Sequence, residues 1–344
     1  MTHISPTWDR LIPLTGVGES PRTFWLMRSA ALLTLAFSAS LGSTGCIKSM
    51  ILNGQIAGTR QASGAFDTMD DYEIAGRAAA SGLVQFEGMH KLAPNNTDAL
   101  FMLTKAWTGF AFGFIEDEME RAEDDGEAAA AAYHRQRAIN AYHRAVNYGL
   151  ELLGHTAEGL EAAKVNEPEL KKWLEANFTS PEDAGALFWT GYAWMARTGV
   201  MKDDAEMVAN LWIGVAFIER SVALDPGYNN SLGKVALGAY HARSAAAEMD
   251  EAKALFEEVI AATGGKALVA QLNYATRFAC ARADTALYTK LLKEVIDSKE
   301  DEPSLRLTNT IAKRRAKRWL GEKRMFDACS MDPLPPETAP TPAS

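Results

Sequence analysis

TSPEDAGALFWTGYAW, at residues 179–194, carries the pattern that decides the fold. A proline and polar residues that can cap a helix open the stretch, and apolar residues then recur at spacings of three and four, the period of an α-helix. The same order of proline, polar residues and apolar helix occurs in LAPNNTDALFMLTKAW at residues 92–107 and in ALDPGYNNSLGKVALGAY at residues 223–240. Such internal similarity is typical of stacked helical hairpins, in which each hairpin buries its apolar face against the next one.

The three stretches fit the first helix of the tetratricopeptide repeat, whose template places small and aromatic residues along two antiparallel helices. The second helices follow at the template spacing around Tyr142, Ile218 and Phe256, and a weaker fourth unit spans residues 266–296. The units are irregular, because an acidic insert at residues 116–136 separates the helices of the first one. We therefore expect the first helix to overrun and the second helix to start late.

Nearly all of the chain from residue 70 to residue 319 has the helical period, and no stretch alternates apolar and polar residues over the length of a strand. We predict an all-α protein of stacked antiparallel helical hairpins, a tetratricopeptide-like α-solenoid. Its single domain should span residues 67–328. A tether and helix start should precede it at 46–66, and a disordered, proline-rich tail should follow it at 329–344.

The segment MRSAALLTLAFSASLGSTGC, at residues 27–46, predicts an export signal that ends at a lipid-attachment cysteine. A basic residue, a short apolar stretch and small residues follow one another in the order of a secretory signal. The apolar stretch is too short to cross a bilayer, so we expect residues 1–45 to be removed and Cys46 to be lipidated, as in a bacterial lipobox. Ser43 stands where lipoboxes usually have an aliphatic residue, which leaves an ordinary signal peptide cut nearby as the alternative. Residues 1–26 are either an N-terminal extension of the signal or lie ahead of the true start.

The sequence also predicts where the lipid would hold the protein. Ile47 follows the cysteine where an Asp would retain a lipoprotein in the inner membrane, so we expect an outer-membrane anchor with the body facing the periplasm. The formal net charge is -9. An acidic body argues against binding nucleic acid or anionic lipids by charge, because both need a basic surface.

Cys280 and Cys329 remain as thiols once Cys46 is lipidated. Neither lies in a CxxC motif or a metal-ligand spacing. We expect two separate thiols, with Cys280 packed in an apolar helix, and keep a disulfide between them as the alternative.

The sequence holds no motif for catalysis, nucleotide binding or a metal ion. It lacks the GxSxG, P-loop and paired-glycine patterns, and His134 and His143 are too far apart to share one face of a helix. The acidic run from Glu116 to Glu127 lacks the alternating ligands and central glycine of an EF-hand, so we expect a solvated helix end and loop. We predict that the protein is not an enzyme and has no metal site and no cofactor.

Aromatic side chains and lysines lie at positions that face the concave groove in the tetratricopeptide register. We predict that the aromatic members hold the apolar body of a small ligand, or of a partner, and that the lysines hold a carboxylate. The alternative is that most of these side chains fill the core between hairpins. The candidate groove residues are Phe101, Lys105, Phe188, Trp189, Tyr192, Lys234 and Tyr240.

Four segments resemble the T-component (TatT) family of tripartite ATP-independent periplasmic (TRAP) transporter systems. They are residues 70–118, 137–153, 186–199 and 309–327, and together with Cys46 they span essentially the mature chain. The last, NTIAKRRAKRWLGEKRMFD, is the most distinctive, since it joins Asn309 to a basic cluster. Taken alone, that cluster predicts the solvated cationic face of a terminal helix.

The resemblance implies a periplasmic lipoprotein of tetratricopeptide-like hairpins that forms a homotrimer and associates with a TRAP periplasmic solute-binding protein. It implies a role in small-molecule uptake, with a hollow that accommodates a ligand and without catalysis. The resemblance does not identify ligand-binding residues in this chain, so the prediction of the groove residues rests on helix register alone. The alternative is a tetratricopeptide scaffold lipoprotein for envelope protein assembly.

Overall fold

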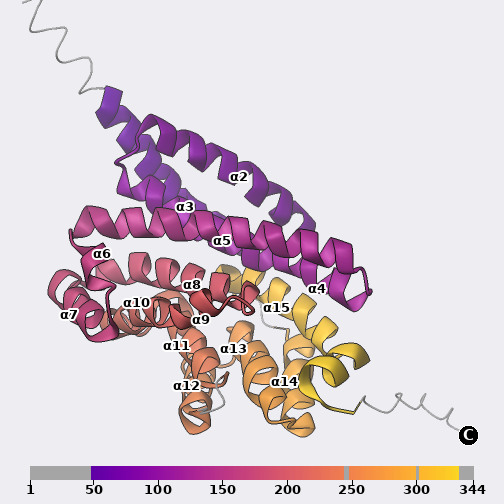
Figure 1. Cartoon of the computed structure of the whole chain (residues 1–344). Coiled ribbons are helices and arrows are strands. Elements are labelled where there is room, and N and C mark those ends of the chain that lie inside the picture. The colour runs from indigo at the N-terminus through magenta and orange to yellow at the C-terminus, as the bar shows by residue number, and fades with distance from the viewer. Residues whose placement is uncertain (1–47, 244–247, 300–301, 333–344) are drawn as a thin grey trace, which may run out of the picture. The chain divides into compact units, whose positions relative to one another are not determined.

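The computed structural model describes residues 48–243, 248–299 and 302–332. Within these ranges the regular elements are helices and no strand occurs, so the predicted all-α fold is confirmed (Figure 1). Residues 48–62 are helical, and contacts divide the chain into a unit Met1–Leu52 and a unit Asn53–Ser344, which holds every element named below. The predicted signal, Cys46 and the part of the predicted tail beyond residue 332 lie outside the described residues.

The α-helices are α2 (Tyr72–Leu92), α3 (Thr97–Phe110), α4 (Glu116–Asp124), α5 (Ala128–Thr156), α6 (Leu160–Ala163), α7 (Glu167–Asn177), α8 (Ala184–Val200), α9 (Ala205–Ala209), α10 (Leu211–Leu224), α11 (Tyr228–His241), α12 (Met249–Ala262), α13 (Leu268–Asn273), α14 (Thr285–Asp297) and α15 (Arg306–Trp319). 3₁₀-helical turns occur at η1 (Ser63–Thr68), η3 (Pro181–Asp183) and η5 (Pro303–Leu305). π-helical turns occur at η2 (Ala111–Ile115), η4 (Tyr274–Ala279) and η6 (Arg324–Ala328).

Consecutive helices pair as the hairpins that the sequence predicts. α3 packs against α5, α8 against α10, and α11 against α12. Neighbouring hairpins also touch, through α5 with α8 and α10 with α11, so each buries its apolar face against the next (Figure 1). As expected, the first helix overruns, because α3, η2 and α4 follow one another without a break before α5 begins at Ala128.

Three helix starts follow a proline, and at two of them a nearby polar side chain caps the start. At α3 the Asn96 side chain accepts a hydrogen bond from the Ala99 amide at 2.9 Å. Before α8 the Asp183 carboxylate accepts one from the Ser180 amide at 3.1 Å. Both bonds satisfy amides that the helix itself leaves without a partner. The third start differs, because α11 begins with a left-handed turn at residues 229–231.

Gly191 and Gly214 let α8 and α10 approach each other closely. A Cβ atom on Gly191 would lie 2.8 Å from the Gly214 carbonyl oxygen, and a Cβ atom on Gly214 would lie 3.0 Å from the Trp194 side chain. A side chain at Gly191 would therefore push the two helices apart.

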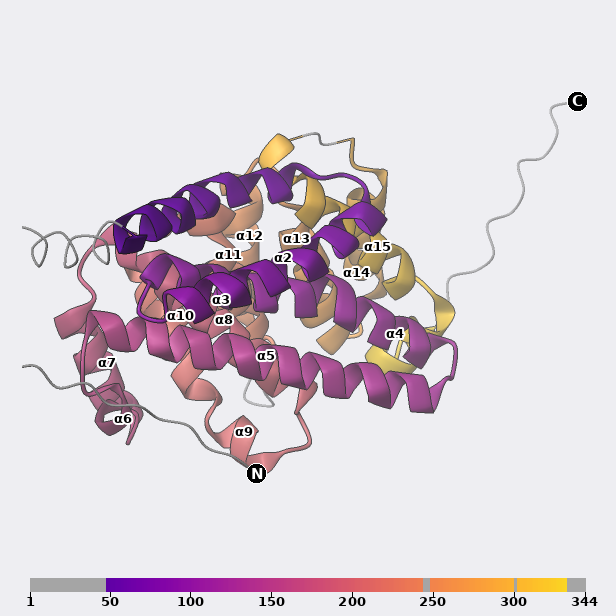
Figure 2. The same ribbon diagram turned by 90° about the horizontal axis from the view of Figure 1, so that it is seen from above.

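The end of the chain returns to its beginning. α15 packs against α13 and α14, and it also contacts α2 and η1 (Figure 2). Its Leu307 and Ile311 form one buried cluster with Ala75 of α2. Contacts between the first and last elements thus close the array of hairpins.

Cys280 and Cys329 form a disulfide, with their Cα atoms 4.7 Å apart, so the prediction of two separate thiols is wrong. Cys280 directly follows η4 and Cys329 directly follows η6, and packing of these distant turns brings the cysteines together. Cys329 and Met331 are buried, so the core reaches past residue 328 into the segment predicted as a tail.

One helical stretch among the described residues, Ala205–Leu224, is long and apolar enough to cross a membrane. In the fold it consists of α9 and α10, and α10 packs against α7, α8 and α11. Ile213, Phe217 and Ile218 of α10 are buried. Packing in the protein core therefore accounts for its apolar composition.

Candidate functional site

An apolar cavity of about 330 Å³ lies where the first and last elements of the fold meet. Its walls come from η1, α2, α3, η2, α8, the start of α11, α13, η5 and α15. Ligand pockets begin at roughly 300 Å³, so this cavity suits a small molecule. Its aromatic lining residues are Phe66, Phe86, Phe101, Phe110, Phe112, Phe114, Trp189 and Tyr192.

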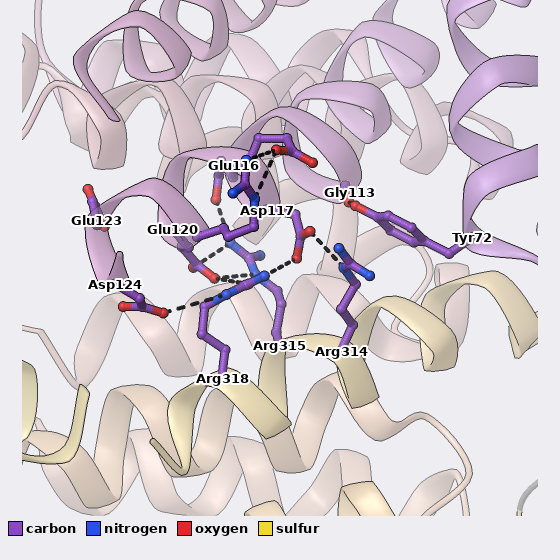
Figure 3. Close-up of polar contacts among 12 residues, drawn as sticks. Tyr72, Gly113, Glu116, Asp117, Glu120, Glu123, Asp124, Arg314, Arg315 and Arg318 are labelled. Atoms are coloured by element: carbon purple, nitrogen blue, oxygen red, sulfur yellow. Dashed lines mark hydrogen bonds and ion pairs between the residues drawn. The ribbon is translucent and has the colours of Figure 1, made fainter. Parts of the chain in front are cut away.

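The π-helical turn η2 supplies one aromatic wall. Phe112 and Phe114 lie on it and Phe110 directly precedes it, and all three line the cavity. The Tyr72 hydroxyl donates a hydrogen bond to the Gly113 carbonyl at 2.8 Å, which ties α2 to this turn (Figure 3). A Cβ atom on Gly113 would lie 2.9 Å from Ile311, so α15 packs directly on the backbone of η2. π-Helical turns occur frequently at functional sites.

Four of the seven predicted groove residues line this cavity, namely Phe101, Lys105, Trp189 and Tyr192. The structure thus brings together side chains from α3 and α8 that the repeat register placed on one surface. Whether they bind a ligand stays a prediction.

The other three predicted groove residues lie elsewhere. Phe188 is fully buried and packs against Trp189, Tyr192 and Tyr228. The Lys234 ammonium forms an ion pair with Glu258 at 2.7 Å. The ring of Tyr240 lies beside His241, with the Arg243 guanidinium 5.0 Å from the ring centroid.

Lys105 and Asp67 are the charged residues of the cavity lining, and they pair with each other. The Lys105 Nζ lies 3.0 Å from the Asp67 carboxylate and 5.8 Å from the centroid of the Trp189 ring. Both charged side chains keep about a third of their surface exposed, at 32% and 35%. The lining therefore carries one charge of each sign.

Tyr192 gives the cavity a hydroxyl group. Burial, assisted by the nearby Glu116 carboxylate, raises the pKa of Tyr192 to about 12. The hydroxyl therefore stays protonated at neutral pH and can donate a hydrogen bond.

Sequence reasoning missed Asn229 and Asn230, which also line the cavity. Their φ angles are 49° and 57°, and Ser231 follows at 59°. Asn tolerates this left-handed region better than most residues, so the NN pair was a signal for such a turn. Strained backbone of this kind clusters at ligand sites, and here it places two amide side chains at an apolar cavity.

A network of ion pairs holds two of the cavity walls together (Figure 3). The Arg315 guanidinium lies 2.8 Å from both Glu116 and Glu120. Arg318 lies 2.7 Å from Asp117 and 2.9 Å from Glu120. Arg314 and Arg324 of the same C-terminal region bind Asp117 and Asp124.

The sequence predicted both halves of this network as solvated charge. This is wrong for the residues that pair, whereas Asp125, Glu127 and Lys317 are exposed as expected. Asp117 is 1% exposed, and Glu120 and Arg315 are each 7% exposed. The acidic run ends the overlong first helix, and the returning α15 covers it with arginines. Each charged run satisfies the other in the interior, where an unpaired charge would be unstable.

Neighbouring charges and burial shift the carboxyl pKa values of this network in opposite directions. Burial alone would raise the pKa of the Glu120 carboxyl, but the guanidinium groups of Arg315, Arg318 and Arg324 outweigh it and hold that pKa below its ordinary value. At Asp124 the effect of burial is larger than that of Arg324, so the pKa of this carboxyl is raised.

The network lies one turn beyond the cavity on both helical segments. Ile311 lines the cavity and Arg314 and Arg315 follow it on α15, while Phe114 lines the cavity and Glu116 follows it on α4. The ion pairs between α4 and α15 therefore fix the distance between the two walls.

Among the described residues, one group of side chains has the composition of a metal site: His241, Glu248 and Glu251. The His241 Nδ1 lies 2.5 Å from Glu248 and its Nε2 lies 3.5 Å from Glu251, so both ring nitrogens already face a carboxylate. None of the three residues lines the cavity.

Comparison with protein-family models identifies the family of the chain. Residues 68–326 match the family model TAtT, described as TRAP transporter T-component. No curated protein matches the chain. The match includes η2, α15 and the two halves of the ion-pair network.

Proposed function

Because the chain belongs to the TAtT family of TRAP transporter T-components, we propose that it binds a small apolar solute for a TRAP-type uptake system. The family consists of transport components and not of enzymes. The observation that carries the proposal is the cavity of about 330 Å³ with its eight aromatic lining residues. Burial of an apolar solute against these rings supplies the affinity, at about 25 cal/mol per Å².

We further propose that the solute is a small apolar carboxylate. Lys105 is the cation of the cavity lining, and an ammonium group beside aromatic rings can orient an acid whose body the rings hold. The Tyr192 hydroxyl and the amides of Asn229 and Asn230 supply further hydrogen-bonding groups.

The partner in this proposal is a TRAP periplasmic solute-binding protein, to which the chain passes solute or from which it receives it. Family membership supports association with other TRAP components. A homotrimer is the assembly that the family resemblance implies. We propose that three such chains present their cavities to three receptors.

The location in this proposal is the periplasmic face of the outer membrane, with Cys46 as the lipid anchor. Cys46 closes a secretion-signal pattern, and Ile47 follows it instead of Asp. The Cys280–Cys329 disulfide supports export, because structural disulfides are typical of oxidising compartments. Several acyl chains would hold the acidic body stably at the membrane.

Pull-down of the full-length protein from detergent extracts, with and without crosslinking, tests the partner. The proposal predicts recovery of a TRAP-type solute receptor. Repeated recovery of envelope-assembly proteins in its place would contradict the proposal and favour a scaffold. For the anchor, Cys46→Ala should move the protein from the membrane to the soluble fraction, and unchanged membrane retention would contradict lipidation.

A further inference from the structure

We infer that Asp67 is a built-in competitor for the acidic group of the ligand. In the free protein the Asp67 carboxylate forms an ion pair with the Lys105 ammonium, and in the complex a ligand carboxylate takes its place in that ion pair. This inference rests on the proposed function, because it concerns how the same cavity selects its solute.

The first step is the charge of the cavity lining. Asp67 and Lys105 are its charged members and lie 3.0 Å apart. In the free protein the Asp67 carboxylate is thus the counter-ion of the Lys105 ammonium. With Asp67 in place the lining is neutral, and a ligand carboxylate that simply added to it would bring an unpaired negative charge. A bound acid therefore takes the place of Asp67 at Lys105.

The second step is that the element carrying Asp67 can move. No residue of η1 is buried. Asp67 of η1 holds α3 through the Lys105 pair. The turn also contacts η5 and α15, and Phe66 packs against the cluster of Ala75, Leu307 and Ile311. A second ion pair, Arg60–Asp98 at 2.5 Å, fastens the preceding helix to α3 and does not involve Lys105. Release of Asp67 therefore removes the ion pair that ties η1 to α3 and leaves the neighbouring Arg60–Asp98 attachment intact.

The third step compares energies. An ion pair between side chains that are a third exposed shifts an equilibrium by about fivefold or less. Burial of an apolar body against the aromatic walls shifts it by far more, since each buried CH₂ group contributes roughly fourfold. A ligand acid can thus displace Asp67, and the competition lowers its affinity only modestly. An uncharged ligand of the same shape leaves the Asp67–Lys105 pair in place.

Calorimetry with octanoate and with 1-octanol as the probes tests the competition. In the full-length protein, Asp67→Asn should tighten octanoate binding by about three- to fivefold, because it removes the competing charge. Lys105→Met should weaken octanoate binding by about three- to fivefold, because the ligand carboxylate loses its counter-ion at a site that is a third exposed. Neither change should alter 1-octanol binding by more than about twofold. Glu175→Gln is the control, since it removes an exposed carboxylate of α7 that lies outside the cavity lining, and it should leave both affinities unchanged.

Hydrogen exchange supplies a second readout, because octanoate should accelerate exchange at the amides of residues 63–68 and 1-octanol should not. If both probes bind the wild type but Asp67→Asn leaves octanoate affinity unchanged or weaker, the competition is overturned and the cavity function stands. If neither probe binds the wild type, the proposed ligand class and the competition fail together.

Discussion

At the scale of single residues, Arg315 carries a positive charge into the interior and meets two carboxylates there. Glu116 and Glu120 each lie 2.8 Å from its Nη2. The guanidinium also lies 4.4 Å from the centroid of Phe112, an aromatic residue of the cavity wall. A single side chain thus links the ion-pair network to the site.

Arg315→Met should destabilise the protein by about 3–5 kcal/mol, because it leaves buried carboxylates without their counter-ion. Urea unfolding measures the loss. Lys317→Met, on the exposed face of the same helix, is the control and should change the free energy of unfolding by no more than about 0.5 kcal/mol. Equal effects of the two substitutions would contradict a buried network.

Glu120 makes stability depend on pH in a defined direction. Its pKa in the fold is held below the ordinary value of 4.5 by Arg315, Arg318 and Arg324, which outweigh the effect of burial. The unfolded chain therefore takes up its proton at a higher pH than the folded chain does. The stabilising contribution is fully present above about pH 4.5 and is lost as the pH falls through the lower folded pKa.

Glu120→Gln should consequently flatten the acid side of the stability profile. Urea midpoints between pH 7 and pH 3 measure it, and the midpoint should fall less in the variant than in the wild type. Parallel profiles for the two proteins would show that Glu120 does not contribute in this way.

Residue-scale pairing could not be predicted from the sequence. The acidic and basic runs each have the composition of a solvated helix face, and nearly 200 residues separate Asp117 from Arg314. The same holds for Cys280 and Cys329, which follow turns that are adjacent only in the fold. A local pattern carries no information about such distant partners.

At the scale of elements, the contact between α8 and α10 depends on backbone approach. A Cβ atom on Gly191 would lie 2.8 Å from the Gly214 carbonyl oxygen, which cannot rotate away as a flexible side chain could. One added methyl group should therefore separate the two helices.

Gly191→Ala should destabilise the protein by about 1–3 kcal/mol through overpacking. Gly199→Ala lies on the same helix, where an added Cβ atom would meet nothing within 4 Å, and it should leave stability unchanged or raise it. Thermal unfolding of the two variants compares them. A Gly191→Ala protein as stable as the wild type would contradict the close approach.

The helices whose period and start are set by residues close together in the sequence could be predicted. The hairpins follow from the helical period and the position of the prolines. The capped starts of α3 and of the turn η3, which leads into α8, follow from Asn96 and Asp183. The π-helical turn η2 has no comparable signal, since tertiary packing decides it, and for the left-handed start of α11 the signal is the Asn229–Asn230 pair, which sequence reasoning missed. These two irregular elements both line the cavity, and local rules fail most often at functional sites.

At the scale of the whole described body, the cavity belongs to no single hairpin. The repeat register placed Phe101, Lys105 and Tyr192 on one surface, but α15 and η1 pack beside them and enclose them in the cavity. The helix register is read from each hairpin separately. It could therefore not show that α15, the last helix, covers the groove predicted on the first hairpin. It also could not show that Phe188 turns into the core.

Native mass spectrometry of the purified full-length protein tests most directly whether this cavity holds the solute. Gly109 lines the cavity, and a Cβ atom there would meet nothing within 4 Å, so Gly109→Leu should narrow the site without a clash at α3. Gly88→Leu, on α2 outside the lining and equally unobstructed, is the matched control. We predict that the wild type and Gly88→Leu retain a small apolar acid, released on denaturation, and that Gly109→Leu lacks it. A Gly109→Leu protein that retains the same molecule, or a wild type that carries none and takes up none, would contradict a solute-binding cavity.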